Sequence, residues 1–136
     1  MIDCSQSFEQ IKEAYNDLIK LEPMSWEEVK LRYKKWKITG VYVIYFNGEI
    51  IYIGSTKNFL VRFGTDLNHK STHTLYNKLL REYPKEEVKD LIRNKFKYKI
   101  KECKDKPEAE CLEHFAILIN KPKYNHYFYK KPLTQA

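Results

Sequence analysis

The feature that most constrains this 136-residue chain is a pair of apolar, tyrosine-containing runs joined by Asn47-Gly48. The runs, Val41–Phe46 and Ile50–Ile53, are rich in Val, Ile and Tyr, which suit a pleated, half-buried surface. Asn-Gly between such runs is the strongest short signal of a β-hairpin, because a type I′ turn needs positive φ at both central residues. The two strands are therefore expected to pair antiparallel, with Tyr42 and Tyr52 near the same end of the ribbon.

Two helices are expected before the hairpin. Apolar residues recur at helical spacing from Ser5 or Ser7 to about Leu21. Ser25 and Glu28 have the spacing of a capping box, which predicts a second helix with an apolar face made of Val29, Tyr33 and Trp36. No Gly/Ser-rich linker follows, so residues 1–39 are expected to pack on the core as a helical extension.

Helical and strand patterns also follow the hairpin. Helices are expected from Ser55 or Thr56 to about Asn68, over His73–Glu82, over Lys85–Arg93 and over Pro107–Asn120. Phe96–Cys103 alternates apolar residues with lysines and predicts a half-buried third strand. In the last helix, Leu112, Ala116 and Ile119 are expected to face the core. The predicted fold class is α+β: a small, mainly antiparallel three-stranded sheet flanked by helices.

The formal net charge of +7 is unevenly distributed. Residues 1–39 contain seven Lys or Arg and seven Asp or Glu, so the whole excess lies in residues 40–136. A basic surface interleaved with aromatic residues favours nucleic acid as a partner, whereas the alternative is that lysines simply solvate a small domain. The candidate phosphate-neutralising residues are Lys57, Arg62, Lys70, Lys78, Lys121, Lys123, Lys130 and Lys131, the last two in a basic, aromatic tail at 127–136.

Composition also argues against several classes of protein. No apolar run approaches the roughly 18 residues of a membrane span, and the N-terminus lacks the pattern of a secretory signal. A cytoplasmic protein is expected, nuclear if the host is eukaryotic. The three cysteines contain no C-x-x-C pair, so neither a disulfide framework nor a structural zinc site is indicated.

The triplets Gly40-Val41-Tyr42 and Tyr52-Ile53-Gly54, followed by Arg62 and Glu113, resemble the GIY-YIG nuclease superfamily. The similarity continues through Gly54–Asn58, Leu112–Phe115 and Lys121–Asn125, and residues 40–126 are expected to form the nuclease-like domain. The resemblance implies hydrolysis of DNA phosphodiester bonds with a single divalent ion, Mg²⁺ or Mn²⁺, and one active site per chain.

The resemblance also implies roles for individual residues. Glu113, at the edge of an apolar seam, would bind the metal, although an ion pair with a lysine is the alternative. Arg62 would hold the scissile phosphate with its planar donor fork. Tyr42 would be a general base or proton relay, and Tyr52 would orient the water or the phosphate. A free phenol titrates at about pH 10, so the base role requires help from Arg62, the metal or a relaying water.

Further residues are candidates for supporting roles. His73, rather than His69, would assist proton transfer, unless both are ordinary loop histidines. Asn125 would support the site's geometry or cap the chain after the last helix. The predicted nucleic-acid contacts are Ser55, Lys57, Asn58, Lys121 and Lys123, and the predicted structural glycines are Gly40 and Gly54, where backbone approaches closely or φ is positive.

Two other functional classes stay open. The domain could bind nucleic acid with little catalysis, or it could be an interaction module whose N-terminal helices bind a second copy of the chain or another protein. The sequence does not distinguish duplex from branched DNA, or DNA from RNA.

Overall fold

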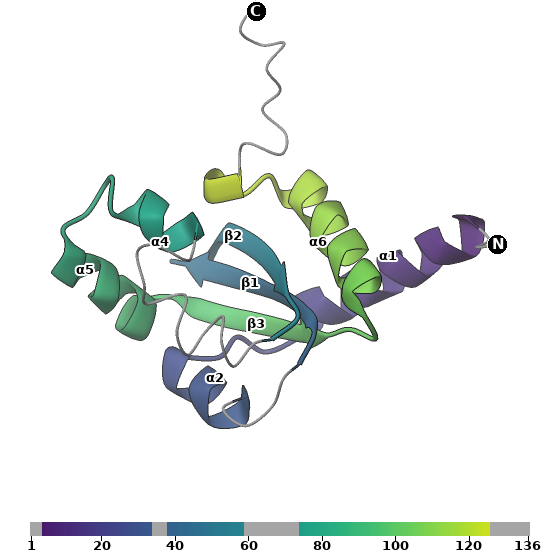
Figure 1. Cartoon of the computed structure of the whole chain (residues 1–136), viewed down its shortest axis with the longest axis horizontal. Coiled ribbons are helices and arrows are strands. Elements are labelled where there is room, and N and C mark those ends of the chain that lie inside the picture. Colours follow the sequence, from purple (N-terminus) through teal and green to yellow (C-terminus); the bar gives the residue numbers. More distant parts are fainter. Residues whose placement is uncertain (1–3, 34–37, 59–73, 126–136) are drawn as a thin grey trace, which may run out of the picture.

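The computed structural model describes residues 4–33, 38–58 and 74–125. The predicted helix from Ser55 to Asn68 lies largely outside these residues, as do Arg62, His69, His73, Trp36 and the tail at 127–136. The described elements, shown in Figure 1, are α1 (Cys4–Lys20), α2 (Trp26–Tyr33), β1 (Gly40–Phe46), β2 (Glu49–Thr56), α4 (Thr74–Leu79), α5 (Lys85–Asp90), the π-helical turn η2 (Leu91–Lys95), β3 (Lys97–Glu102), α6 (Lys106–Asn120) and the 3₁₀ turn η3 (Lys123–Asn125). Within the described ranges, no helix combines the length and the apolarity needed to cross a membrane.

The sheet confirms the predicted α+β class and the predicted hairpin. Its three strands run antiparallel in the order β2-β1-β3, so β1 is central and β2 lies at an edge. Asn47 and Gly48 have φ values of 53° and 78°, which are the positive angles that a type I′ turn requires. At the other end of the hairpin, Tyr42 lies opposite Gly54 in the register.

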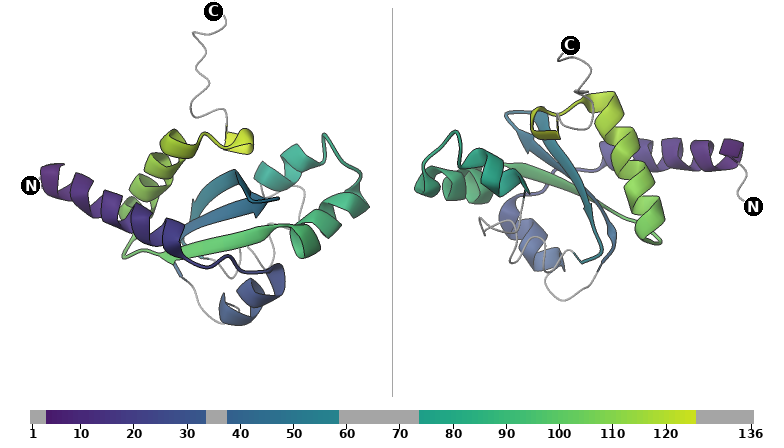
Figure 2. Two further views of the ribbon diagram at one scale, coloured as in Figure 1. Left: turned by 180° about the vertical axis from the view of Figure 1, so that it is seen from behind. Right: turned by 45° about the horizontal axis from the view of Figure 1, so that its top comes forward.

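Each face of the sheet has its own apolar core. Tyr42 and Tyr52 belong to the core that α2, α4, α5 and η2 cover, whereas Val43 and Ile53 belong to the core under α1 and α6. Figures 1 and 2 show this division, with α1 and α6 on one side of the sheet and the remaining helices gathered on the other. The strands are thus buried on both faces.

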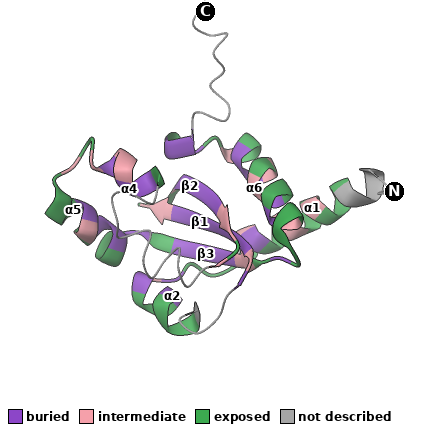
Figure 3. Cartoon of the chain, viewed as in Figure 1, coloured by how far each residue is buried: buried purple, intermediate pink, exposed green. Residues whose placement is uncertain are grey.

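The third strand differs from its predicted half-burial because α1 covers its lysine-bearing face. Lys99 is only 8% exposed. Its Nζ donates to the carbonyl oxygen of Ile19 at 2.6 Å and lies 4.9 Å from the ring centroid of Tyr45. Figure 3 shows the corresponding buried stretch of β3. The alternation of apolar residues and lysines in the sequence does not predict that Lys99 is buried. Its burial depends on the C-terminal end of α1, where the lysine ammonium donates to the Ile19 carbonyl oxygen.

The helix termini follow local signals. Ser25 and Glu28 form the predicted capping box: the Ser25 N–H donates to Glu28 Oε1 at 2.9 Å, and the Glu28 N–H donates to Ser25 Oγ at 3.2 Å. The α6 helix begins at Lys106, one residue before the predicted start, and its cap is Asp105, whose Oδ1 accepts from the Glu108 N–H at 3.0 Å. Both helices therefore begin where side chains satisfy their first N–H groups.

One predicted core residue of α6 is wrong. Leu112 and Ala116 are fully buried, but Ile119 is 53% exposed and Ile117 is buried instead. Positions 117 and 119 both lie beside the helix face that residues 112 and 116 define. The sequence alone does not say which of the two faces the sheet.

Candidate active site

The first component of the site is the contact between α6 and the end of β2. Ser55 Oγ donates to Glu113 Oε1 at 2.7 Å, and both side chains are partly buried. The buried face of α6, which includes Ala109, Leu112 and Ala116, seats the helix against the sheet. Glu113 lies beside that face, as its spacing predicts, and therefore reaches the edge strand rather than the outer face of the helix.

The second component is Tyr42, whose ring occupies the space that a side chain at position 54 would need. A Cβ built on Gly54 would lie 2.4 Å from Tyr42 Oη and 2.5 Å from Tyr42 Cζ. Gly54 is thus a place of close approach, one of the two reasons predicted for a glycine there. Since Gly54 and Ser55 are consecutive, Tyr42 and Glu113 approach the same short stretch of β2.

The first glycine of the motif has a related reason. A Cβ on Gly40 would lie 2.2 Å from the carbonyl oxygen of Lys101 in β3. Gly40 therefore allows β1 and β3 to pair closely where the central strand begins.

The two tyrosines of the motif are neighbours on one face of the hairpin. Their ring centroids are 6.2 Å apart and the ring planes are inclined by 38°. Both side chains are buried among the residues under α2, α4 and α5, on the opposite face of the sheet from α6. The structure therefore brings Tyr42 and Tyr52 together and places Glu113 across the edge strand from them.

Asn125 completes the arrangement from the free edge of β2. Its Oδ1 accepts from the Ile53 N–H at 2.8 Å, and its Nδ2 donates to the Ile53 carbonyl oxygen at 2.9 Å. The side chain is fully buried, so it satisfies two main-chain groups that would otherwise be costly to bury. Asn125 therefore holds the edge strand at Ile53, between Tyr52 and Gly54, and its role in an active site stays a prediction.

The end of β2 is not the helix start that was predicted. Ser55 and Thr56 belong to the strand, and Thr56 Oγ1 accepts from the Asn58 N–H at 3.0 Å in the turn that follows. The argument that a helix N-terminus at Ser55 attracts phosphate is therefore wrong for this residue. Lys57, in the same turn, is exposed just beyond the Ser55–Glu113 contact. Arg62 and His73 fall outside the described residues, and their roles stay predictions.

The two other predicted phosphate contacts lie away from Glu113. Lys121 and Lys123 line an open groove of about 550 Å³ beside the hairpin turn, with Gly48, Glu49 and Asn120 among its walls. Along α6, Lys121 is eight residues beyond Glu113, a distance of about 12 Å at the usual helical rise. A phosphate at Glu113 and a phosphate in this groove would therefore be different groups of one substrate.

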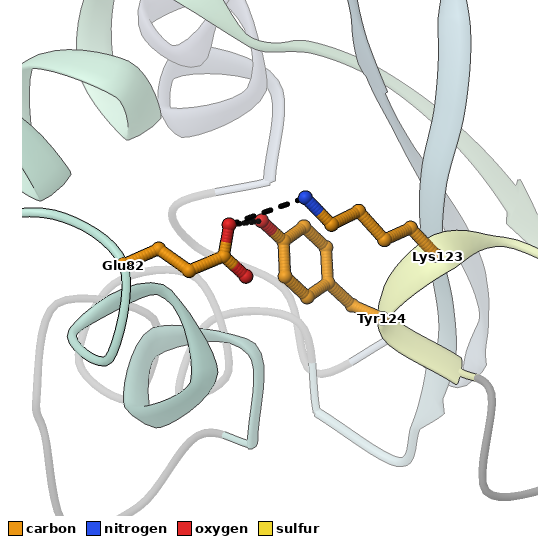
Figure 4. Close-up of polar contacts among 3 residues, drawn as sticks. All are labelled: Glu82, Lys123 and Tyr124. Carbon is orange, nitrogen blue, oxygen red and sulfur yellow. Dashed lines mark hydrogen bonds and ion pairs between the residues drawn. The ribbon is translucent and has the colours of Figure 1, made fainter.

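Contacts of Lys78, Glu82 and Tyr124 escaped the sequence analysis. Glu82 Oε1 accepts from both Lys123 Nζ and Tyr124 Oη at 3.1 Å, as Figure 4 shows. Lys78 Nζ donates to the Tyr124 carbonyl oxygen at 2.6 Å. The partners are more than forty residues apart, and no local pattern pairs them.

The described part of the chain holds no ready-made cluster of metal ligands. No group of three or more His, Cys, Asp or Glu residues gathers there. Magnesium nevertheless suits such a site, because it keeps several water molecules and is commonly bound through only one or two carboxylates. The carboxylate of Glu113 is partly buried, one of its oxygens accepts from Ser55, and carboxylate oxygen is the kind of ligand atom that this ion prefers.

No protein-family model matches the chain, and no curated protein matches it. Among solved structures, the magnesium-bound GIY-YIG N-terminal endonuclease domain of UvrC from Thermotoga maritima matches with a TM-score of 0.50 and 23% identity, covering 72% of this chain and 96% of that domain. Two point mutants of the same domain, each with a tyrosine replaced by phenylalanine, match at 23% and 22% identity with TM-scores of 0.50.

The chain therefore has the GIY-YIG fold. This confirms the predicted architecture, a three-stranded antiparallel sheet with flanking helices.

Proposed function

We propose that this chain is a metal-dependent endonuclease that hydrolyses phosphodiester bonds in DNA, with one active site per chain. The observation that carries the proposal is the Ser55–Glu113 contact, which places a carboxylate beside the residue on which Tyr42 packs. The likeness to a magnesium-bound endonuclease domain supports it. Duplex and branched DNA are the proposed substrate classes.

Glu113 is the proposed ligand of the divalent ion, Mg²⁺ or Mn²⁺. When bound, such an ion supplies positive charge to a phosphate oxygen and eases departure of the leaving oxygen. The hydrogen bond from Ser55 holds one carboxylate oxygen of Glu113 at 2.7 Å and so limits the rotation of this side chain. A carboxylate whose position is already restricted loses less conformational entropy when it binds.

Tyr42 is the proposed acceptor or relay of the proton from the attacking water. Its hydroxyl lies against the main chain of Gly54, and the next residue, Ser55, donates to Glu113. The neighbouring ring of Tyr52 restricts the position of Tyr42 and is proposed to orient the water or the phosphate. Arg62 is proposed to hold the scissile phosphate and His73 to assist proton transfer, on the strength of the sequence pattern.

DNA contacts are proposed on both sides of the carboxylate. Lys57 and Asn58 follow the site directly, and Lys121 with Lys123 lies at the hairpin-turn end of the edge strand. Charge contacts spaced along one edge suit a backbone of regularly spaced phosphates.

The test is cleavage of supercoiled plasmid and of a branched duplex with Mg²⁺, with Mn²⁺ or with chelator. The wild type is expected to nick only with the divalent ion, and Glu113→Gln to lower the rate at least about 100-fold, the scale of losing a main electrostatic contribution. Glu110→Gln is the matched control, because Glu110 lies on the same helix, is exposed and forms a 3.9 Å ion pair with Lys106. It is expected to cut within about twofold of wild type.

The outcomes separate the functional classes. Salt-sensitive DNA binding without any wild-type cleavage would replace the nuclease by a nucleic-acid-binding module. Equal losses in the Glu113 and Glu110 variants would remove the assignment of the metal to Glu113.

A further inference from the structure

The cluster of Glu82, Lys123 and Tyr124 lies outside the proposed catalytic groups but contacts the segment that holds them. One carboxylate oxygen of Glu82 accepts both the ammonium of Lys123 and the phenol of Tyr124, as drawn in Figure 4. The hydrogen bond to Glu82 raises the pKa of Lys123, and burial followed by the same acceptor raises the pKa of Tyr124. Both side chains therefore remain donors at neutral pH.

A second contact from the same region reaches the main chain of Tyr124. Lys78, in the last turn of α4, donates from Nζ to the Tyr124 carbonyl oxygen at 2.6 Å. Burial, and to a smaller extent the charge of Arg81, lowers the pKa of Lys78. The turn after α4 and the helix itself thus bind the hydroxyl and the carbonyl of one residue.

Residue Tyr124 belongs to η3, an element too short to be stable alone. It spans Lys123–Asn125, and the Asn125 N–H donates to the Pro122 carbonyl oxygen at 3.0 Å. A single 3₁₀ turn fixes several dihedral angles for one hydrogen bond, so tertiary contacts must hold it. The contacts from Lys78 and Glu82 meet that need on the side facing α4.

The next residue transmits the position of η3 to the edge strand. Asn125 binds both main-chain groups of Ile53, between Tyr52 and Gly54. Hydrogen bonds and short stretches of covalent chain therefore connect Glu82, through Tyr124 and Asn125, to the strand that presents Ser55 to Glu113.

We infer that Glu82 and Lys78 are positioning residues for the active site, acting through Tyr124 and Asn125 to hold the β2 edge in register. The catalytic part of this inference rests on the proposed nuclease function. The structural part, that the contacts of Lys78 and Glu82 with Tyr124 protect the Ile53 amide, does not.

The experiment uses the full chain and measures amide hydrogen exchange by NMR together with cleavage kinetics. The informative variants are Tyr124→Phe, which removes only the hydroxyl, Glu82→Ala, which removes the acceptor, and Glu82→Gln, which keeps an acceptor oxygen. Glu86→Ala is the control, since Glu86 is an exposed acid in the first turn of the adjacent α5.

Tyr124→Phe and Glu82→Ala are expected to speed exchange of the Ile53 amide at least fivefold. The Tyr98 amide, which donates to the Met24 carbonyl oxygen at the far edge of the sheet, is expected to keep its wild-type exchange rate. The same variants should lower kcat about tenfold with KM within twofold of wild type. Glu82→Gln should restore most of both properties, and Glu86→Ala should change neither.

Two results would overturn the inference: unchanged Ile53 exchange in both variants, or equal acceleration at Ile53 and Tyr98, which would indicate loss of global stability. If the wild type cuts no DNA, the proposed function fails, but Ile53 exchange still decides whether Glu82 positions the edge strand. Wild-type cutting with unchanged Ile53 exchange would instead reject the positioning role alone.

Discussion

The ring of Tyr42 lies against the main chain of Gly54, so close that a methyl group at position 54 would be 2.4 Å from the tyrosine hydroxyl. Tyr42 is fully buried and Tyr52 packs beside it, which leaves the ring little room to move. Tyr42 and Gly54 thus pack as one unit, because the absence of a side chain at position 54 lets the tyrosine ring reach the edge strand.

Gly54→Ala is therefore expected to destabilise the protein by about 1–3 kcal/mol, the usual cost of overpacking. Urea denaturation measures this cost. In the double variant Gly54→Ala/Tyr42→Leu, the shorter leucine side chain leaves space for the alanine methyl group. The double variant should therefore lose less stability than the sum of the losses in the two single variants. Strict additivity would show that the ring does not limit position 54.

Asn125→Asp should distinguish the donor from the acceptor function of the side chain. Aspartate still accepts from the Ile53 N–H, but its ionised carboxylate faces the Ile53 carbonyl oxygen. The free energy of unfolding is expected to fall by about 2–4 kcal/mol at pH 8, because the buried carboxylate and the Ile53 carbonyl oxygen repel each other and that carbonyl loses its donor.

The pH dependence of that variant has a definite sign. Burial beside a carbonyl favours the protonated acid, so its folded-state pKa would lie above the unfolded value. The stability of the variant should therefore rise as pH falls from 8 to 5, measured against wild type at each pH. If the variant is less stable than wild type by the same amount at pH 8 and at pH 5, the proposed contact is contradicted.

Lys121 ends α6 in the left-handed region, with φ of 46°, and its N–H donates to the Ile117 carbonyl oxygen at 2.7 Å. A residue with a Cβ pays about 1 kcal/mol there, so Lys121→Gly should raise stability by roughly that amount. Lys121→Ala removes the charge but keeps the strain, and is expected to leave stability within about 0.5 kcal/mol. If both variants also weaken DNA binding, the charge rather than the backbone accounts for that binding.

Lys99→Met keeps most of the apolar stem but leaves the Ile19 carbonyl without its 2.6 Å donor. Thermal denaturation is expected to show a loss of stability of about 1–2 kcal/mol, because the partly buried Ile19 carbonyl loses a charged donor. Lys97→Met, at an exposed position of the same strand, is the matched control and should stay within about 0.5 kcal/mol of wild type. If both variants lose a similar amount of stability, the contact of Lys99 with α1 does not stabilise the fold.

The buried thiol of Cys103 should react far more slowly than the exposed thiol of Cys111. Burial, followed by the charge of Glu108, raises the pKa of Cys103 from 9.0 to about 11. Its thiol is favoured in the folded state below pH 9, and this contribution to stability is lost as pH rises towards 11. Alkylation with iodoacetamide at pH 8, followed by peptide mass spectrometry, should modify Cys111 at least tenfold faster.

Local signals accounted for much of this molecule. The Asn47-Gly48 turn, the Ser25–Glu28 box and the placement of Glu113 beside the buried face of α6 all depend on residues within about one or two turns of chain. Such features follow from backbone preference and helical spacing, which a sequence displays directly.

The rest depended on which elements meet. Burial of Lys99 needs α1 across β3, and exposure of Ile119 depends on where the sheet ends beneath α6. The Asn125–Ile53 pairing joins residues 72 positions apart, and Glu82 reaches Tyr124 across 42. These contacts exist because the folded chain must satisfy buried polar groups wherever packing places them, and only the tertiary structure specifies those places.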